Sequence, residues 1–324
     1  MKKAVLFITE GNSLTGWGHA IRCSAISQII STNFDTYLLN SNFDIPTFDF
    51  ISNSFSFTIN SLKEINVQNC IVLIDRKSLN NTFIIENGIS RNSLIIIDDL
   101  YKTYDCHSII NHSISATPLR YDNSTFKNLY LGPSYALLRP PFLQKNYNSS
   151  YKKNILNFLV CVGGTDTNCF SYIITKTILE FFPKANVSIV IGLNPELKQK
   201  LMVFQGRVSI YEKIDAQEMC KLICFSDLAV TSASTLSYEC CAVGIGLITG
   251  YYTEDQVDFC KSLKDKKLSL SVGNFNINLA AKLARIFSTI NPIDINNMIK
   301  VQNTVFPNHI RNNILDIFLN IKNT

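Results

Sequence analysis

Short apolar runs separated by polar, turn-rich segments recur along the whole chain. Apolar runs of this length, bounded by turn residues, are typical of buried β-strands. In the first half they predict strands at 4–8, 36–39, 70–74, 94–97 and 108–111. In the second half they predict strands at 156–162, 187–191, 208–211, 228–231 and 245–249. The segment 41–60 has no clear period, and no element is predicted there.

Helical patterns lie between many of these strands. They predict helices at 19–30, 216–224, 235–243, 254–263 and 310–321, and two more that end near Phe182 and Phe204. Regular alternation of strands and helices favours parallel sheets covered on both faces. The segment 144–154 is rich in Asn, Ser, Tyr and Lys, a composition typical of an interdomain linker. We therefore expect an α/β protein with two Rossmann-like parallel-sheet domains, 1–148 and 149–324, and a ligand-binding cleft between them.

Composition narrows the class of protein. The chain has 324 residues, of which 46% are hydrophobic and 17% charged, as expected for two packed domains. The net charge of +5 comes from scattered basic residues, so no nucleic-acid partner is expected. No apolar stretch approaches the ~18 residues of a membrane-spanning helix, and the run 4–8 is shorter than the roughly 7–15 residues of a signal-peptide core. We expect a soluble, cytoplasmic protein.

The ten cysteines agree with this interpretation. None belongs to a C-x-x-C pair, whereas zinc sites usually show two ligand pairs with short spacings. We interpret the cysteines as reduced, buried thiols of a cytosolic protein, and we expect no metal ion and no other cofactor.

One segment carries most of the candidate chemistry: Gly16-Trp17-Gly18-His19, with Arg22 three residues further on. It follows the first predicted strand, and open parallel sheets bind ligands at the carboxyl ends of strands. Glycines allow close approach of the backbone, the helix start favours an anion, and a histidine can accept a proton near neutral pH. Histidines also satisfy backbone groups, but here we favour a functional role. The weaker candidates His107, His112 and His309 are expected to be structural or solvated.

Two further turns follow predicted strands: Gly163-Gly164-Thr165-Asp166 and Ser232-Ala233-Ser234-Thr235. The second is the better phosphate candidate, because small residues and hydroxyl donors meet the start of a helix there. Glu239 lies one turn further along, where a carboxylate can accept hydrogen bonds from ribose hydroxyls. Taken alone, the serines are better explained as ordinary helix caps.

The turns do not match the common nucleotide-binding signatures, and the carboxylates that follow strands have two interpretations. The turns have neither the G-x-G-x-x-G spacing nor a following Gly-Lys-Ser/Thr, which argues against a Rossmann dehydrogenase and a P-loop enzyme. Asp75 and the pair Asp98-Asp99 also follow predicted strands. Carboxylates at such positions either cap the next helix or belong to a site.

Several segments, taken in order, resemble the motifs of one enzyme family. They are Gly16 to Cys23, Asp98 to Leu100, Asp105 to Asn111, Gly132 to Arg139, Gly163 to Asp166, Ser232 to Thr235 with Glu239, and Glu254 to Gln256. These look like blocks of the UDP-2,4-diacetamido-2,4,6-trideoxy-β-L-altropyranose hydrolases of pseudaminic acid biosynthesis. Their shared order and spacing, over most of the chain, carry the resemblance.

The resemblance implies a fold similar to the two-domain GT-B glycosyltransferases, with the nucleotide held mainly by the second domain. It implies that His19 activates water, so that a UDP-linked deoxy-diacetamido sugar is hydrolysed to free sugar and UDP with inversion and without a metal. The substrate- and nucleotide-binding residues it implies are Gly16, Gly18, Arg22, Tyr135, Arg139, Gly164, Thr165, Ser234, Thr235, Leu236, Glu239, Asp255 and Gln256. In proteins of this type a final helix can cross back to the first domain, and 310–321 is the candidate.

Two positions depart from the family pattern. Where the family tends to have Asp-x-Tyr after a strand, this chain has Asp75-Arg76-Lys77. Asp255 stands where the family often has Asn. These departures affect the expected sugar pocket and one nucleotide contact more than they affect hydrolysis.

The sequence leaves three other functions open. The closest is a GT-B glycosyltransferase that uses a UDP-sugar donor in surface polysaccharide synthesis, because the same base would act on a sugar or lipid hydroxyl instead of water. A UDP-sugar 2-epimerase shares the fold class. A non-catalytic nucleotide-sugar sensor would bind the same ligand without turnover.

Overall fold

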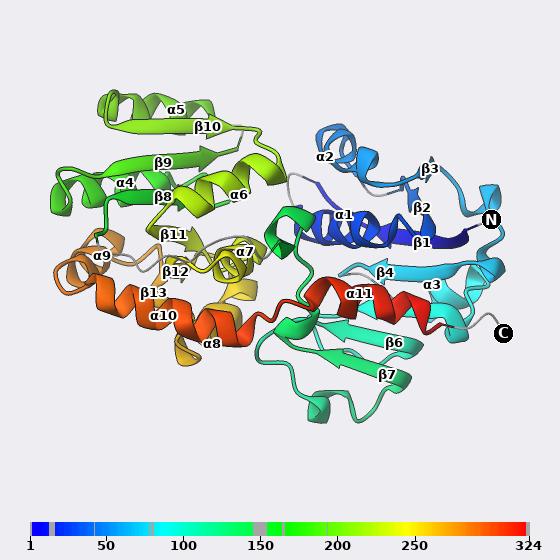
Figure 1. The fold of residues 1–324 in the computed structure, drawn as a ribbon. Helices are drawn as coiled ribbons and strands as arrows, with labels where there is room; N and C mark the ends of the chain where they lie inside the picture. Colours follow the sequence, from blue (N-terminus) through cyan, green and yellow to red (C-terminus); the bar gives the residue numbers. More distant parts are fainter. Residues whose placement is uncertain are drawn as a thin grey trace. The chain divides into compact units, whose positions relative to one another are not determined.

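The computed structural model describes residues 2–12, 17–41, 43–77, 79, 81–144, 154–163, 166–192 and 194–321. The chain divides into two compact units (Figure 1). The first comprises Met1–Leu143 together with Pro307–Thr324, and the second comprises Gln144–Phe306. Each unit has a parallel sheet and a hydrophobic core of its own.

The first unit is built on a parallel sheet of seven strands in the order β3-β2-β1-β4-β5-β6-β7. Its strands are β1 (Lys3–Thr9), β2 (Phe34–Leu39), β3 (Phe57–Ile59), β4 (Ile71–Asp75), β5 (Leu94–Ile97), β6 (Asp105–Asn111) and β7 (Thr125–Leu131). Its helices are α1 (Gly18–Ile30), α2 (Ile45–Ile51), α3 (Asn81–Glu86) and α11 (Ile310–Leu319). The strand order reverses between β1 and β4, and open α/β sheets bind ligands at such a switch point.

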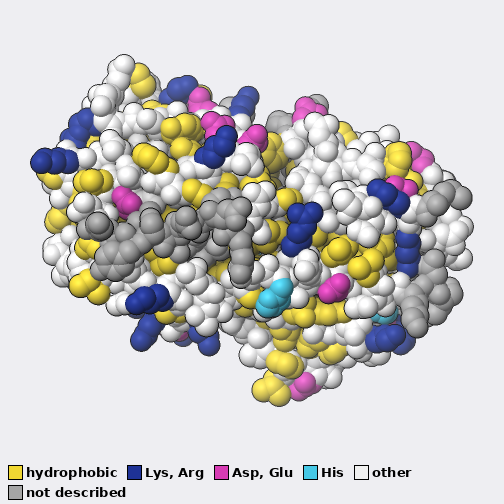
Figure 2. All heavy atoms as spheres, viewed as in Figure 1, with side chains coloured by type: hydrophobic (Ala, Val, Ile, Leu, Met, Phe, Trp, Pro, Cys, Tyr) yellow, Lys and Arg dark blue, Asp and Glu magenta, His cyan; other side chains and the backbone are white. Residues whose placement is uncertain are grey.

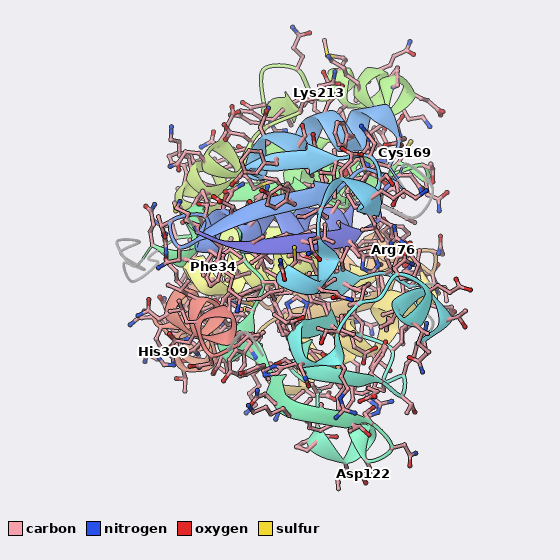
Figure 3. All side chains as sticks on the ribbon, turned by 90° about the vertical axis from the view of Figure 1, so that its right-hand side faces the viewer. Phe34, Arg76, Asp122, Cys169, Lys213 and His309 are labelled. Carbon is pink, nitrogen blue, oxygen red and sulfur yellow. The ribbon has the colours of Figure 1, made fainter. Side chains whose placement is uncertain are left out.

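The C-terminal helix α11 packs beside α1 in the first unit (Figure 1). The ring of Phe318 on α11 lies 6.1 Å from the ring of Phe34, which Figure 3 labels at the start of β2. The ammonium group of Lys3 donates to the backbone oxygen of Ile321 at 2.7 Å, just past the end of the helix. Apolar burial and this charge at the helix C-terminus tie the end of the chain to the first sheet.

The second unit is built on a parallel sheet of six strands in the order β10-β9-β8-β11-β12-β13. Its strands are β8 (Asn157–Cys161), β9 (Asn186–Ile191), β10 (Val208–Glu212), β11 (Leu228–Ser232), β12 (Gly246–Tyr251) and β13 (Leu270–Asn274). Its helices are α4 (Phe170–Phe181), α5 (Pro195–Leu201), α6 (Ala216–Phe225), α7 (Thr235–Val243), α8 (Val257–Asp265), α9 (Leu279–Phe287) and α10 (Pro292–Val305). Here the strand order reverses between β8 and β11.

The expectation of two parallel α/β sheets is therefore confirmed. The apolar pattern predicts ten of the strands, but it does not predict β3, β7 and β13, or the helices α2, α3, α9 and α10. The reason is clear for two of the strands. β3 has only three residues, and β7 is an edge strand whose side chains are half-buried or exposed. Neither offers the continuous buried run that identifies a central strand.

The surface adds two observations. No helix within the described ranges is both long enough and apolar enough to cross a membrane. Figure 2 shows the Lys and Arg side chains spread over the visible face rather than gathered into one stripe.

Candidate functional site

The first candidate site begins at the switch point of the first sheet. β1 and β4 are paired in parallel, and Thr9 lies opposite Asp75 at their carboxyl ends. The next element along the chain after β1 is α1, and His19 and Arg22 lie in the first turns of this helix. Residues three apart lie on the same face of a helix, which turns both side chains toward the end of β4.

His19 is hydrogen-bonded to the carboxylate of Asp75. Its Nδ1 lies 2.6 Å from Oδ1 of Asp75, and the two side chains are 12% and 1% exposed. An ionised carboxylate only accepts hydrogen bonds, so a bond from His19 to Asp75 requires the proton on Nδ1, whereas Nη2 of Arg22, 2.9 Å from the same nitrogen, can only donate to it. No other described side chain or backbone group bonds to the second ring nitrogen, Nε2. In a neutral His19 with its proton on Nδ1, Nε2 is the nitrogen that can act as a general base.

Arg22 joins two carboxylates. Its Nε and Nη2 donate to Oδ2 and Oδ1 of Asp75 at 2.5 and 2.6 Å, and its Nη1 donates to both oxygens of Asp99 at 2.9 and 3.1 Å. Burial opposes the ionisation of Asp75, but the adjacent Arg22 charge lowers the pKa of Asp75 to about 2. Burial likewise opposes the charge on Arg22, yet Asp75 and Asp99 raise the pKa of Arg22 well above its usual value. Asp75 and Arg22 are therefore both charged at neutral pH.

The neighbouring carboxylate Asp98 explains why Asp99 reaches Arg22. Asp98 is buried and accepts hydrogen bonds from the hydroxyl groups of Tyr104 (2.8 Å) and Tyr121 (2.7 Å). It also accepts from the backbone N–H groups of Leu100 and Tyr101. These four bonds hold the loop after β5 with Asp98 turned inward. The next side chain, Asp99, is 44% exposed and pairs with Arg22.

His112, for which the sequence predicts a structural or solvated role, also lies near these charged groups. It follows β6 directly, and its Nδ1 accepts from the backbone N–H of Leu137 at 3.2 Å. Burial first, and then the charge of Arg22, lowers the pKa of His112 to about 4. His112 is therefore neutral at pH 7.

The carboxyl ends of four adjacent strands thus meet in this cluster. Asp75, Asp99 and His112 come from the ends of β4, β5 and β6, while His19 and Arg22 follow β1. The sequence identifies His19 and Arg22 and leaves the role of the two carboxylates open. Asp75, Asp99 and His112 share one sequence feature that could have predicted their role, because each lies at or just after the end of a buried strand.

The remaining predicted residues of the first unit have different surroundings. Gly16 lies outside the described residues, and Gly18 is the first residue of α1. The ring of Tyr135 packs 5.1 Å from that of Tyr130 on the edge strand β7. The guanidinium of Arg139 lies 5.1 Å over the ring of Phe142. Among the described hydrogen bonds, Arg22 is the predicted binding residue of this unit that contacts His19.

The second candidate site is the start of α7, at the carboxyl end of β11. The backbone N–H of Ser237 donates to the backbone oxygen of Ser234 at 2.9 Å, and the N–H of Ser234 lies 3.4 Å from the hydroxyl of Ser237. Within the described chain, no group accepts from the N–H groups of Thr235 and Leu236. Such unpaired N–H groups at a helix start favour an anion. Glu239, one turn further along, is 1% exposed.

The other predicted residues of the second unit are less closely grouped. Gly164 and Thr165 lie outside the described residues. Asp166 accepts from the N–H groups of Phe170 and Ser171 at 2.8 and 2.9 Å, so it caps α4. Asp255 is exposed, and the side chain of Gln256 accepts from the N–H of Tyr252 at 3.2 Å.

The residues that the structure describes contain no group of three or more His, Cys, Asp or Glu side chains that could hold a metal ion. The carboxylates of Asp75 and Asp99 form ion pairs with Arg22.

Comparison with known proteins identifies one sequence relative. No family model matches the chain. It is 23% identical, over 148 residues, to the spore coat polysaccharide biosynthesis protein SpsG of Bacillus subtilis strain 168. The match spans 45% of this chain and 44% of that protein, so it covers less than half of either.

Solved structures are similar over the whole chain. The crystal structure of Acinetobacter baumannii MurG matches with a TM-score of 0.61 at 12% identity, covering 98% of this chain and 99% of that one. The glycotransferase of kitacinnamycin matches with a TM-score of 0.63 at 11% identity, covering 98% of both chains. Anabaena HepE in complex with UDP and glucose matches with a TM-score of 0.58 at 12% identity, covering 99% and 100%. At such low identity the likeness is one of fold, and the predicted GT-B-type fold is confirmed.

Proposed function

We propose that this chain is a GT-B-type enzyme that transfers a glycosyl group from a UDP-sugar to a hydroxyl group in surface polysaccharide biosynthesis. The observation that carries the proposal is the hydrogen bond of 2.6 Å between His19 and Asp75, which leaves Nε2 of His19 as a base. The name of the relative from Bacillus subtilis supports the polysaccharide context. The neighbours that are glycosyltransferases or hold UDP support the donor class.

The residues of the first unit supply the base. Nε2 of His19 accepts the proton of the attacking hydroxyl as its oxygen forms a bond to the anomeric carbon. The bond from that carbon to the phosphate oxygen breaks, and UDP leaves with the electron pair. Asp75 stabilises the imidazolium ion that forms, as a carboxylate does beside a catalytic histidine. General-base assistance of this kind contributes roughly 10²–10⁴ in rate.

The residues at the start of α7 are proposed to hold the nucleotide. A nucleoside diphosphate is already a stable anion, so it needs charge stabilisation more than protonation. The N–H groups of Thr235 and Leu236, with the hydroxyl groups of Ser234 and Thr235, are the proposed donors to the diphosphate. Losing one such preorganised donor typically costs about 3 kcal/mol of barrier. Glu239 is the proposed partner of the ribose hydroxyls.

Hydrolysis is the second candidate, and the ordered motifs of the sequence favour it. In that reaction the same base takes a proton from water, and the product is the free sugar, which the resemblance implies is a deoxy-diacetamido sugar. The donor, the base and the leaving group are common to both reactions. They differ only in which hydroxyl group attacks.

Incubation with UDP-sugars, followed by proton NMR, distinguishes the functions. Transfer predicts that the donor is consumed only when a sugar or lipid acceptor is added. Hydrolysis predicts free sugar and UDP without an acceptor, and the first anomer released reports inversion. A new UDP-linked sugar would indicate an epimerase. Binding of UDP-sugars without consumption of any, with or without acceptors, would refute an enzymatic function. His19→Ala is expected to retain UDP binding and lose turnover.

A further inference from the structure

We propose that Asp99 is a positioning residue that acts through Arg22 to keep the proton of His19 on Nδ1. The inference rests on the proposed function, because only the tautomer protonated on Nδ1 leaves Nε2 to serve as the base. Asp99 has no hydrogen bond to His19 among the described contacts. The guanidinium group of Arg22, which contacts both residues, is the described link between them.

The inference starts from the two neighbours of Nδ1. Oδ1 of Asp75 lies 2.6 Å from this nitrogen, and Nη2 of Arg22 lies 2.9 Å from it. The carboxylate can only accept a hydrogen bond and the guanidinium can only donate one. If Nδ1 carries the proton, it donates to Asp75 and Nε2 is a base. If Nδ1 accepts from Arg22, the proton lies on Nε2 and the base is lost.

Asp99 decides between these states by sharing the charge of Arg22. Nη1 of Arg22 donates to both oxygens of Asp99, while Nε and Nη2 donate to Asp75. The two carboxylates and the one guanidinium together carry a net negative charge, and Asp75 remains a strong acceptor for the proton on Nδ1. Without the charge of Asp99, Arg22 is balanced by Asp75 alone, and its Nη2 competes more strongly for the lone pair of Nδ1.

Among the described contacts, Asp75 and Asp99 are the carboxylates bonded to Arg22, because Asp98 is bonded to Tyr104 and Tyr121 instead. Burial lowers the pKa of His112 to about 4, so His112 is neutral. The thiol of Cys23 lies 3.8 Å from Oδ2 of Asp75, and burial raises the pKa of Cys23 well above its usual value, so it is also neutral. Further out, Glu10 and Arg76 carry opposite charges that interact with each other. Asp99 is thus the second carboxylate on Arg22.

The test compares the His19 tautomer in the wild-type chain and in Asp99→Asn by NMR of protein labelled with ¹⁵N-histidine. The two tautomers give different ¹⁵N shifts for Nδ1 and Nε2, and the signals missing from His19→Gln identify those of His19. We expect the wild type to be protonated on Nδ1. We expect Asp99→Asn to move a substantial fraction of the His19 signal to the form protonated on Nε2. Asp99→Glu keeps the charge and is expected to restore the wild-type pattern.

Asp105→Asn is the matched control. It also removes a carboxylate paired with an arginine, Arg91 at 3.2 Å, but this pair is exposed and neither residue contacts His19. Its spectrum is expected to match the wild type. In activity, Asp99→Asn is expected to lower kcat by roughly tenfold or more with KM for the donor changed less than about twofold.

An unchanged His19 tautomer in Asp99→Asn would overturn the inference, as would a shift of the same size in Asp105→Asn. The NMR comparison needs no substrate. If the wild-type chain turns over no UDP-sugar, the proposed function fails while the tautomer result still decides the role of Asp99. Because Asp99 is half exposed, its replacement is expected to leave the fold intact, which a melting curve checks.

Discussion

Replacing Asp75 by Asn is the sharpest perturbation of the proposed base. The carboxylate is 1% exposed and accepts three hydrogen bonds of 2.5–2.6 Å, one from His19 and two from Arg22. Asn has nearly the same shape but carries no charge and presents one oxygen. Its NH2 group, which can only donate, must then face either His19 or Arg22, and both of these side chains need an acceptor.

We expect one effect on turnover and one on stability. The imidazolium ion loses its carboxylate partner and the tautomer is no longer fixed, so kcat is expected to fall by roughly 10²–10⁴. Breaking a buried ion pair typically destabilises a protein by about 3–5 kcal/mol. Asp99 remains bonded to Arg22, so we expect a loss of about 3 kcal/mol, at the low end of that range.

Turnover of the UDP-sugar and urea denaturation measure these two effects separately. Binding of UDP, measured by calorimetry, serves as the internal control because the start of α7 lies in the second unit. Its dissociation constant is expected to change less than about twofold. Turnover within about threefold of the wild type would refute the role of Asp75, because a base without a fixed tautomer loses far more.

Three further predictions follow from the same contacts. Because the pKa of Asp75 is lowered from 3.8 to about 2, its ionisation stabilises the fold above pH 4. This contribution, about 2 kcal/mol, is lost as the pH falls from 4 to 2. Asp75→Asn should flatten that part of the curve of unfolding free energy against pH. The pKa of His112 is lowered from 6.5 to about 4, so its contribution to stability is present above pH 6.5 and lost as the pH falls toward 4. His112→Asn, whose side-chain oxygen can still accept from Leu137, should remove this loss in urea titrations at pH 7, 5.5 and 4. The same slope of unfolding free energy against pH in the variant and the wild type would contradict the assignment. Glu239→Gln should weaken UDP binding roughly tenfold by calorimetry, since it removes a charged acceptor for ribose, whereas the exposed Glu254→Gln should not; equal affinities would exclude Glu239 from the nucleotide site.

The candidate site shows how far local sequence carries a prediction. His19 and Arg22 are three residues apart on one helix, so their proximity follows from helical geometry alone. The start of α7 is likewise local, because a strand, a turn of small residues and a helix follow one another along the chain. The roles proposed for Ser234 and Glu239 stay predictions, as do those of Tyr135, Arg139, Asp255 and Gln256.

The chain by itself determined its two parallel sheets, because central strands of such sheets are continuous buried runs that stand out between helices. The GT-B-type fold that the solved structures share was predicted from the resemblance of the chain's ordered motifs to a known family. Only the tertiary structure decided which carboxylates surround His19. Asp75 lies 56 residues away in the chain and Asp99 lies 77 residues from Arg22, and strand order brings them together. Charge pairing across such separations leaves no local period, since it depends on which strands become neighbours when the sheet forms.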